Sequence, residues 1–223
     1  MLIEGAASPD RYFNDADVAL IVDRILTGDS ARLVQFAKEA VLTDRRRDAS
    51  ATFGLNPNLQ RLAREIADAG ARILSRPPAD RRQLRGALAQ RLVYELVRSR
   101  EPSTKVEVKF NLTPPGQVGH IVSNPKDVAT ESDPVEVYEC KRRAERLDQA
   151  DLDELGAIHK AGQAYGREVL ATVACLESSY ALSLVLQRMT IRQPLYHACE
   201  EDLLELRDAP PRRRLTKSLA RHG

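Results

Sequence analysis

The residues of this chain best suited to chemistry are a carboxylate and an ammonium two positions apart, Glu139 and Lys141. They end the segment 134–141, in which valines alternate with polar residues as in a short β-strand. Because strand side chains alternate between faces, both charged groups should point the same way. A carboxylate can hold a hard divalent cation, and a neighbouring lysine can position a water or stabilise developing negative charge. The pair therefore predicts metal-assisted attack on a phosphodiester, although an ordinary ion pair at an exposed strand end is the simpler interpretation of so short a motif.

The segments around this pair predict an α/β domain. A helical run at about 149–165 follows the pair, and then an apolar segment at 168–175 that is typical of a buried strand. A strand, a crossover helix and a second strand make a βαβ unit, so 134–141 and 168–175 should be parallel neighbours. Upstream, 104–110 alternates polar and apolar residues, and 118–123 predicts another short strand after a Pro-Pro-Gly turn.

This order of elements, with Glu-x-Lys at the end of the third strand, resembles the PD-(D/E)xK nuclease superfamily. The resemblance covers roughly residues 80–206 and implies a restriction-endonuclease-like mixed sheet flanked by helices. Glu139 and Lys141 match the family's (D/E)xK signature. The stretch 86–97 is similar to the family's first helix, whose active-site glutamate falls at Gln90, with Glu95 further along the same helix.

Two positions depart from the family's pattern. The metal-binding aspartate of the second strand falls at Gly119, or at His120 if the register slips by one, and Gln90 replaces the helical glutamate. His120 could substitute as a ligand, although imidazole suits zinc or manganese better than magnesium. Asp127 and Asp133, in the connection between the strands, could also move in, although a loop holds a carboxylate less firmly than a strand does.

The resemblance implies a divalent-metal-dependent nuclease in which Glu139 and the backbone carbonyl of Cys140 hold Mg²⁺ or Mn²⁺, while Lys141 orients the attacking water. Arg142 and Arg143 directly follow the motif and are expected to bind phosphate, because guanidinium groups pair with phosphate in bidentate fashion. The expected substrate is nucleic acid, with DNA favoured. The alternative is a catalytically weak or inactive protein of this fold that binds nucleic acid or a partner protein as a structural or regulatory subunit. The two departures favour the alternative, and the intact Glu-x-Lys motif favours the enzyme.

Length and composition predict a globular protein with one substantial core and an accessory segment. The chain has 223 residues, of which 43% are hydrophobic and 30% charged, and its formal net charge is only +2. The pattern predicts an N-terminal helical segment over 1–78, a nuclease-like domain over 79–208 and a basic flexible tail over 209–223. The block 44–55, which contains three consecutive arginines, is the expected mobile loop.

The cysteines and the hydropathy pattern bear on the compartment. The three cysteines lack metal-ligand spacing, and the sequence has neither a charged-then-apolar leader nor an apolar run of membrane-spanning length. A reducing cytoplasm is therefore expected, with no membrane partner. The amphipathic N-terminal helices could pack on the core, form a homodimer, bind a partner protein or contact nucleic acid.

Overall fold

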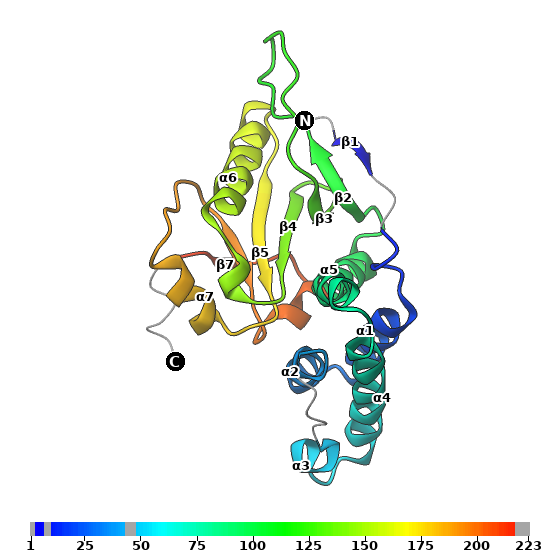
Figure 1. Cartoon of the computed structure of the whole chain (residues 1–223). Helices are drawn as coiled ribbons and strands as arrows, with labels where there is room; N and C mark the ends of the chain where they lie inside the picture. Colours follow the sequence, from blue (N-terminus) through cyan, green and yellow to red (C-terminus); the bar gives the residue numbers. More distant parts are fainter. Residues whose placement is uncertain (1–2, 7–9, 43–47, 217–223) are drawn as a thin grey trace. The chain divides into compact units, whose positions relative to one another are not determined.

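The computed structural model describes residues 3–6, 10–42 and 48–216 (Figure 1). The chain divides into two compact units, Asp10–Leu92 and the combination of Met1–Pro9 with Val93–Gly223. Within the described ranges, no helix combines the length and the apolar character needed to cross a bilayer.

The unit Asp10–Leu92 is helical, and several of its helices begin at side-chain caps. Its elements are α1 (Ala16–Gly28), α2 (Ala31–Ala40), α3 (Ala49–Phe53), α4 (Pro57–Leu74) and the first part of α5 (Pro78–Arg100). The Asp15 carboxylate accepts backbone N–H groups at the start of α1, and the Asn56 side chain does the same for α4. Apolar faces of α1 and α4, which include Ile21 and Ile66, are fully buried. The packing of these faces holds the unit together.

The second unit is built on a seven-stranded mixed sheet in the described residues. The strands lie in sequence order: β1 (Ile3–Ala6), β2 (Lys105–Phe110), β3 (Lys126–Ala129), β4 (Val135–Lys141), β5 (Val169–Cys175), β6 (Tyr196–Ala198) and β7 (Arg213–Arg214). Pairing is antiparallel from β1 to β4, parallel from β4 to β6, and antiparallel between β6 and β7. The expected α/β class with a mixed sheet flanked by helices is therefore confirmed.

The predicted βαβ unit is also confirmed. Helix α6 (Gln149–Ala164) connects β4 to β5, and these strands pair in parallel register from Val135 opposite Val169 to Lys141 opposite Cys175. Figure 1 shows α6 alongside these strands. Apolar side chains between α6 and the sheet, such as Val137, Ile158 and Val173, form one core cluster. This core fixes the end of β4 beneath the first turns of α6.

Three expectations about local structure are wrong. Residues 118–123 form no strand: the segment makes one isolated bridge, Asn111 to Val122, and exposes Val118 and Ile121. The prolines and glycines within 114–119 favour an irregular loop, and the strand that pairs antiparallel with β4 is β3 instead. The N-terminal segment is not wholly helical, because Ile3–Ala6 pairs with β2.

The third correction concerns flexibility. Within the expected mobile loop 44–55, Ala49–Phe53 is helix α3, and within the expected flexible tail 209–223, Arg213–Arg214 is strand β7. A side-chain cap at Asp48 and pairing with β6 supply the order that composition does not reveal. The remaining parts of these predictions, at 43–47 (including Arg45, Arg46 and Arg47) and 217–223, lie outside the described residues.

The sheet face opposite α6 is held by a buried ion pair. The guanidinium of Arg100, near the end of α5, donates to both carboxylate oxygens of Glu136, with an Nη1–Oε1 distance of 2.7 Å. Tyr138 donates its hydroxyl to the same carboxylate, and Arg100 Nε donates to the Leu206 carbonyl at 2.7 Å. Because side chains alternate along a strand, Glu136 and Tyr138 lie on the face of β4 opposite Glu139. This network is therefore separate from the charged residues on the α6 side of the strand.

The close approach of α6 to β5 gives a test of the fold. A Cβ added at Gly162 would overlap the Val169 side chain and lie 3.2 Å from the Arg167 carbonyl oxygen. We expect Gly162→Ala to destabilise the protein by about 1–3 kcal/mol in urea unfolding, since backbone and a buried β-branched side chain cannot easily yield. Gly86→Ala is the matched control: a Cβ there meets nothing within 4 Å. It should stabilise by about 0.5–1 kcal/mol through helix propensity. Equal effects of both substitutions would contradict this packing.

Candidate functional site

Glu139 and Lys141 lie together at the carboxyl end of β4, on the face covered by α6. Lys141 Nζ donates to Glu139 Oε1 at 2.8 Å and pairs with Asp151 Oδ2 of α6 at 2.9 Å. Both side chains are largely buried, with 12% of the Glu139 side chain and 16% of the Lys141 side chain exposed. The pair is therefore no loose surface ion pair, because both partners are held from two elements.

A third predicted residue type, the aspartate, is supplied by β3. Val128 lies opposite Tyr138 and Ala129 opposite Val137, so Asp127 and Glu139 are the next positions in this antiparallel register. The backbone N–H of Cys140 donates to Asp127 Oδ2 at 2.6 Å. This bond fixes the Asp127 carboxylate at the edge of β4. Asp127 therefore lies beside the Glu-x-Lys motif, where the sequence predicts residue 119 or 120.

The environment of Asp127 shifts its acidity. Burial, and then the negative charge of Glu139, raise the pKa of Asp127 to about 7, although the Cys140 N–H and the two nearby lysines act in the opposite direction. A carboxyl group with a raised pKa beside a second carboxylate is common at functional sites. The two acids are close enough for their charges to interact, which is what a shared cation would require.

A buried lysine that the sequence analysis did not single out joins the site. Lys126 Nζ donates to Glu139 Oε2 at 3.0 Å and to Glu154 Oε2 of α6 at 3.0 Å, and 3% of its side chain is exposed. Ion pairs thus connect five side chains of alternating charge into one chain: Glu154, Lys126, Glu139, Lys141 and Asp151. The run links β3 and β4 to α6.

Both lysines of the site are ammonium ions at neutral pH. Burial by itself would lower the pKa of Lys141, but Glu139 and Asp151 outweigh burial and raise the pKa above its ordinary value. The same balance, with Glu139 and Glu154 as the acidic partners, raises the pKa of Lys126. A protonated Lys141 cannot remove a proton from water. It can orient a water molecule or offset negative charge that develops on a phosphate.

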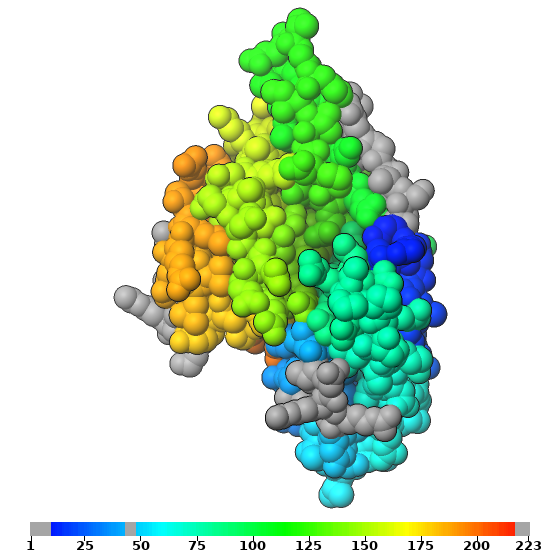
Figure 2. All heavy atoms as spheres, viewed as in Figure 1, coloured from blue at the N-terminus to red at the C-terminus, as the bar shows by residue number. Residues whose placement is uncertain are grey.

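Gly119 and His120 do not belong to this site, which corrects their predicted placement. Both are exposed residues of the loop that the Asn111–Val122 bridge closes. That loop projects beyond the sheet in Figure 1 and stands out from the surface as the green projection in Figure 2. The error arises from the strand prediction. A second strand at 118–123 places the expected aspartate at residue 119 or 120, seven or eight residues before Asp127.

The remaining predicted residues have mixed positions. Arg142 and Arg143 directly follow β4 and are partly buried, and Arg143 Nη1 pairs with Glu145 at 2.9 Å. Their phosphate contacts remain a prediction. Burial raises the pKa of the Cys140 thiol well above its ordinary value, so its side chain stays a neutral thiol and only its backbone suits the site. Gln90 lies on α5 within the unit Asp10–Leu92, and its role also remains a prediction.

The oxygen donors of the site suit a hard divalent cation. The described residues contain no group of three or more His, Cys, Asp or Glu side chains placed to hold a metal ion. A divalent cation here would draw on Asp127 and Glu139, with backbone and water oxygens as further ligands, as is usual for Mg²⁺. Its charge would also offset the repulsion between carboxylates that contributes to the raised pKa of Asp127. Asp127 and Glu139 therefore supply two oxygen donors of the type that such an ion prefers.

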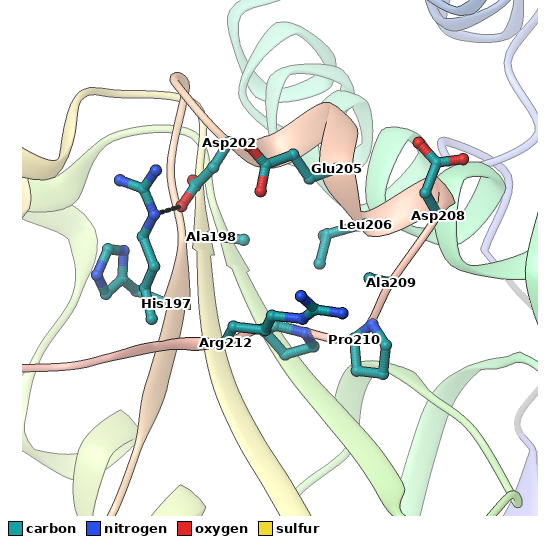
Figure 3. Close-up of a pocket in the computed structure, with 11 residues that line it drawn as sticks. His197, Ala198, Asp202, Glu205, Leu206, Asp208, Ala209, Pro210 and Arg212 are labelled. Atoms are coloured by element: carbon teal, nitrogen blue, oxygen red, sulfur yellow. Dashed lines mark ion pairs between the residues drawn. The ribbon is translucent and has the colours of Figure 1, made fainter.

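A separate cavity of about 400 Å³ with charged residues in its wall lies near β6 (Figure 3). Asp202 lies in its wall, accepts the Cys199 backbone N–H at 2.6 Å and pairs with Arg213 at 2.9 Å. Burial lowers the pKa of His197 to about 4, so its imidazole is neutral. These bonds stabilise the β6–β7 edge, whereas the carboxylate–lysine arrangement that could do hydrolytic chemistry lies at β3 and β4.

Comparisons with known proteins give little to set beside this geometry. No protein-family model and no curated protein matches the chain. Among solved structures, the chain is similar to protein VC1899 from Vibrio cholerae, with 14% sequence identity and a TM-score of 0.47. The match covers 91% of this chain and 56% of that one, so the chain spans just over half of its length. A likeness this weak carries no argument about function.

The pKa of Asp127 predicts how stability should depend on pH. Because the folded-state pKa of about 7 exceeds the ordinary aspartate value of 3.8, the stability contributed by the protonated carboxyl is complete below about pH 4 and is lost as the pH rises through 7. Asp127→Asn stays neutral and still accepts the Cys140 N–H. We expect it to stabilise the protein in EDTA by about 1–4 kcal/mol at pH 8, with a smaller gain at pH 5, in urea unfolding.

The control for this prediction is Glu168→Gln, which removes an exposed carboxylate from the same unit. It should change stability by less than about 0.5 kcal/mol at either pH. A destabilised Asp127→Asn protein at pH 8, or equal gains at pH 5 and pH 8, would contradict the buried, charge-repelled carboxyl.

Proposed function

We propose that this chain is a divalent-metal-dependent nuclease of the PD-(D/E)xK type, with a restriction-endonuclease-like fold, that hydrolyses phosphodiester bonds in DNA. One observation carries the proposal: Asp127 on β3 lies beside Glu139 and Lys141 on β4, with its carboxylate bonded to the Cys140 backbone N–H. Gly119 at the position expected for the metal-binding aspartate is the reason to consider an inactive protein. A strand-held aspartate at position 127 supplies that carboxylate.

Each residue of the site has a role that its contacts support. Asp127 and Glu139 would hold Mg²⁺ or Mn²⁺ together with the Cys140 carbonyl oxygen. The bound ion would activate water and stabilise developing charge on the phosphate. Lys141, kept as an ammonium by Glu139 and Asp151, orients the attacking water and donates to the phosphate oxygens. Arg142 and Arg143, next along the chain, bind the flanking phosphates.

The alternative is a catalytically weak or inactive protein of this fold that binds nucleic acid or a partner protein as a structural or regulatory subunit. The specific observation in its favour is that both Glu139 oxygens already accept from lysine ammonium groups, Oε1 from Lys141 and Oε2 from Lys126. A carboxylate compensated in this way needs no metal ion. The two functions differ in whether the chain cuts DNA.

A cleavage assay on plasmid and single-stranded DNA, with Mg²⁺ and then Mn²⁺, tests the proposal. We expect cutting by the wild-type chain and a loss of at least about 100-fold for Asp127→Asn, Glu139→Gln and Lys141→Met, since each removes a charge that acts on the reacting phosphate or its metal ion. All three should stay folded by circular dichroism.

Two control variants separate this site from the position assigned by the sequence analysis. Gly119→Asp adds a carboxylate in the projecting loop and should not raise cleavage, and Lys109→Met removes an exposed lysine of β2 and should leave it within about twofold. Absence of cleavage with either metal ion would favour the binding protein. Wild-type cleavage by Lys141→Met would place the active site elsewhere.

A further inference from the structure

Lys126 has an unusual position for a lysine. It lies in β3 directly before Asp127, and its ammonium group is buried between Glu139 of β4 and Glu154 of α6, 3.0 Å from an oxygen of each. Lysine is rarely buried unless it is paired, and here one ammonium serves two carboxylates from different elements. One of these carboxylates is a proposed metal ligand, and the other lies outside the proposed ligand set.

We infer that Lys126 is an internal cation that exchanges with a divalent cation at Glu139. Its ammonium group neutralises Glu139 when the site holds no divalent ion, and it is retained by Glu154 alone when Glu139 becomes a metal ligand. The inference rests on the proposed function, because it concerns occupancy of the same site. It adds a regulatory property, namely that the chain's own lysine sets the affinity of the site for metal ions.

The geometry makes such an exchange feasible. Both carboxylate oxygens of Glu139 already accept from ammonium groups, Oε1 from Lys141 and Oε2 from Lys126. A divalent ion that binds Glu139 must therefore share an oxygen with an ammonium group or displace it. Lys141 and Lys126 each have a second acidic partner, Asp151 and Glu154 respectively. Lys126 is the more deeply buried of the two, with 3% of its side chain exposed against 16% for Lys141, and it directly precedes Asp127, the other proposed ligand.

Glu154 is placed to receive the displaced charge. Its carboxylate accepts from the Asn124 side chain, with an Nδ2–Oε2 distance of 3.1 Å, and from the Asn124 backbone N–H. These bonds hold Glu154 in place whether or not Lys126 also contacts Glu139. Leaving a buried charge without a partner strongly destabilises a protein, so a fixed second acceptor lets Lys126 release Glu139 without that penalty.

A double-mutant cycle on Mn²⁺ affinity, measured from the electron paramagnetic resonance of free Mn²⁺ with the full chain, tests the exchange. We expect Lys126→Met to bind Mn²⁺ at least about tenfold more tightly than wild type, because the competing ammonium is gone. Glu154→Gln should bind about fivefold more weakly, because Lys126 then depends on Glu139. In the Lys126→Met background, Glu154→Gln should change the affinity by less than about twofold, because Glu154 acts through Lys126.

The cycle separates exchange from simple charge effects. If Glu154→Gln weakens binding by the same factor in both backgrounds, the two residues act independently and the exchange is overturned. If folded Lys126→Met binds no more tightly than wild type, the exchange also fails, while Mn²⁺ binding that Asp127→Asn abolishes would leave the proposed function standing. If no protein of the cycle binds Mn²⁺, the proposed function fails together with the exchange.

Two measures keep the test decisive if a variant is unstable. Circular dichroism melting identifies variants that do not fold, and Lys126→Gln, which retains a hydrogen-bonding group, then replaces Lys126→Met with the same expected direction. The double variant removes both a positive and a negative charge, so it preserves the local charge balance. Lys160→Met, which removes an exposed lysine from the same α6 helix, should leave Mn²⁺ affinity within about twofold.

Discussion

The pairing of β3 with β4 is the constraint on which the rest of the site depends. Its register places Asp127 next to Glu139, and a bond from the Cys140 backbone N–H to the Asp127 carboxylate continues the pairing beyond the last ladder position. Two acidic side chains are thereby held together in a largely buried region. Such an arrangement is unfavourable unless positive charge is supplied nearby, and the surrounding structure supplies it.

The compensating charges also explain how α6 is attached to the sheet. Lys126 and Lys141 each join a β-strand to an acidic residue of α6, Glu154 and Asp151 respectively. Apolar packing beneath α6 provides the main stabilisation and fixes the helix against the strands. The ion pairs constrain its position further, because each requires a particular pair of atoms to meet within about 3 Å. The same contacts therefore position the helix and prepare the charges of the candidate site.

The sequence predicts much of this arrangement, because several elements carry strong local patterns. The strands at 104–110, 134–141 and 168–175 alternate or are continuously apolar, and the helix between the last two has a clear period, so their order and the parallel βαβ pairing follow. Glu139 and Lys141 are found for the same reason, since they end a recognisable strand. Their mutual contact follows directly from strand alternation.

Strand β3 could not be found by pattern. Lys126–Ala129 is four residues long and begins with two charged residues, so neither its length nor its hydropathy distinguishes it from a loop. By contrast, Val118 and Ile121 make their loop look like a strand, although it makes an isolated Asn111–Val122 bridge with adjoining backbone hydrogen bonds and no strand ladder in the described residues. The site depends on long-range pairing, as does the burial of Lys126, and such pairing leaves no periodic signal. Pro125 directly before Lys126 is the cue that comes nearest, since proline is tolerated at the start of a strand.

We propose that Asp127 and Glu139 together form a site for a divalent cation. Anomalous diffraction from crystals of the full chain grown with Mn²⁺ tests this site most directly, because the signal locates the ion without reference to activity. We expect an anomalous peak within coordinating distance of carboxylate oxygens of both Asp127 and Glu139, and no such peak in crystals of Asp127→Asn. A peak at the projecting loop that carries Gly119 and His120, or none near β3 and β4 at saturating Mn²⁺, would rule the site out.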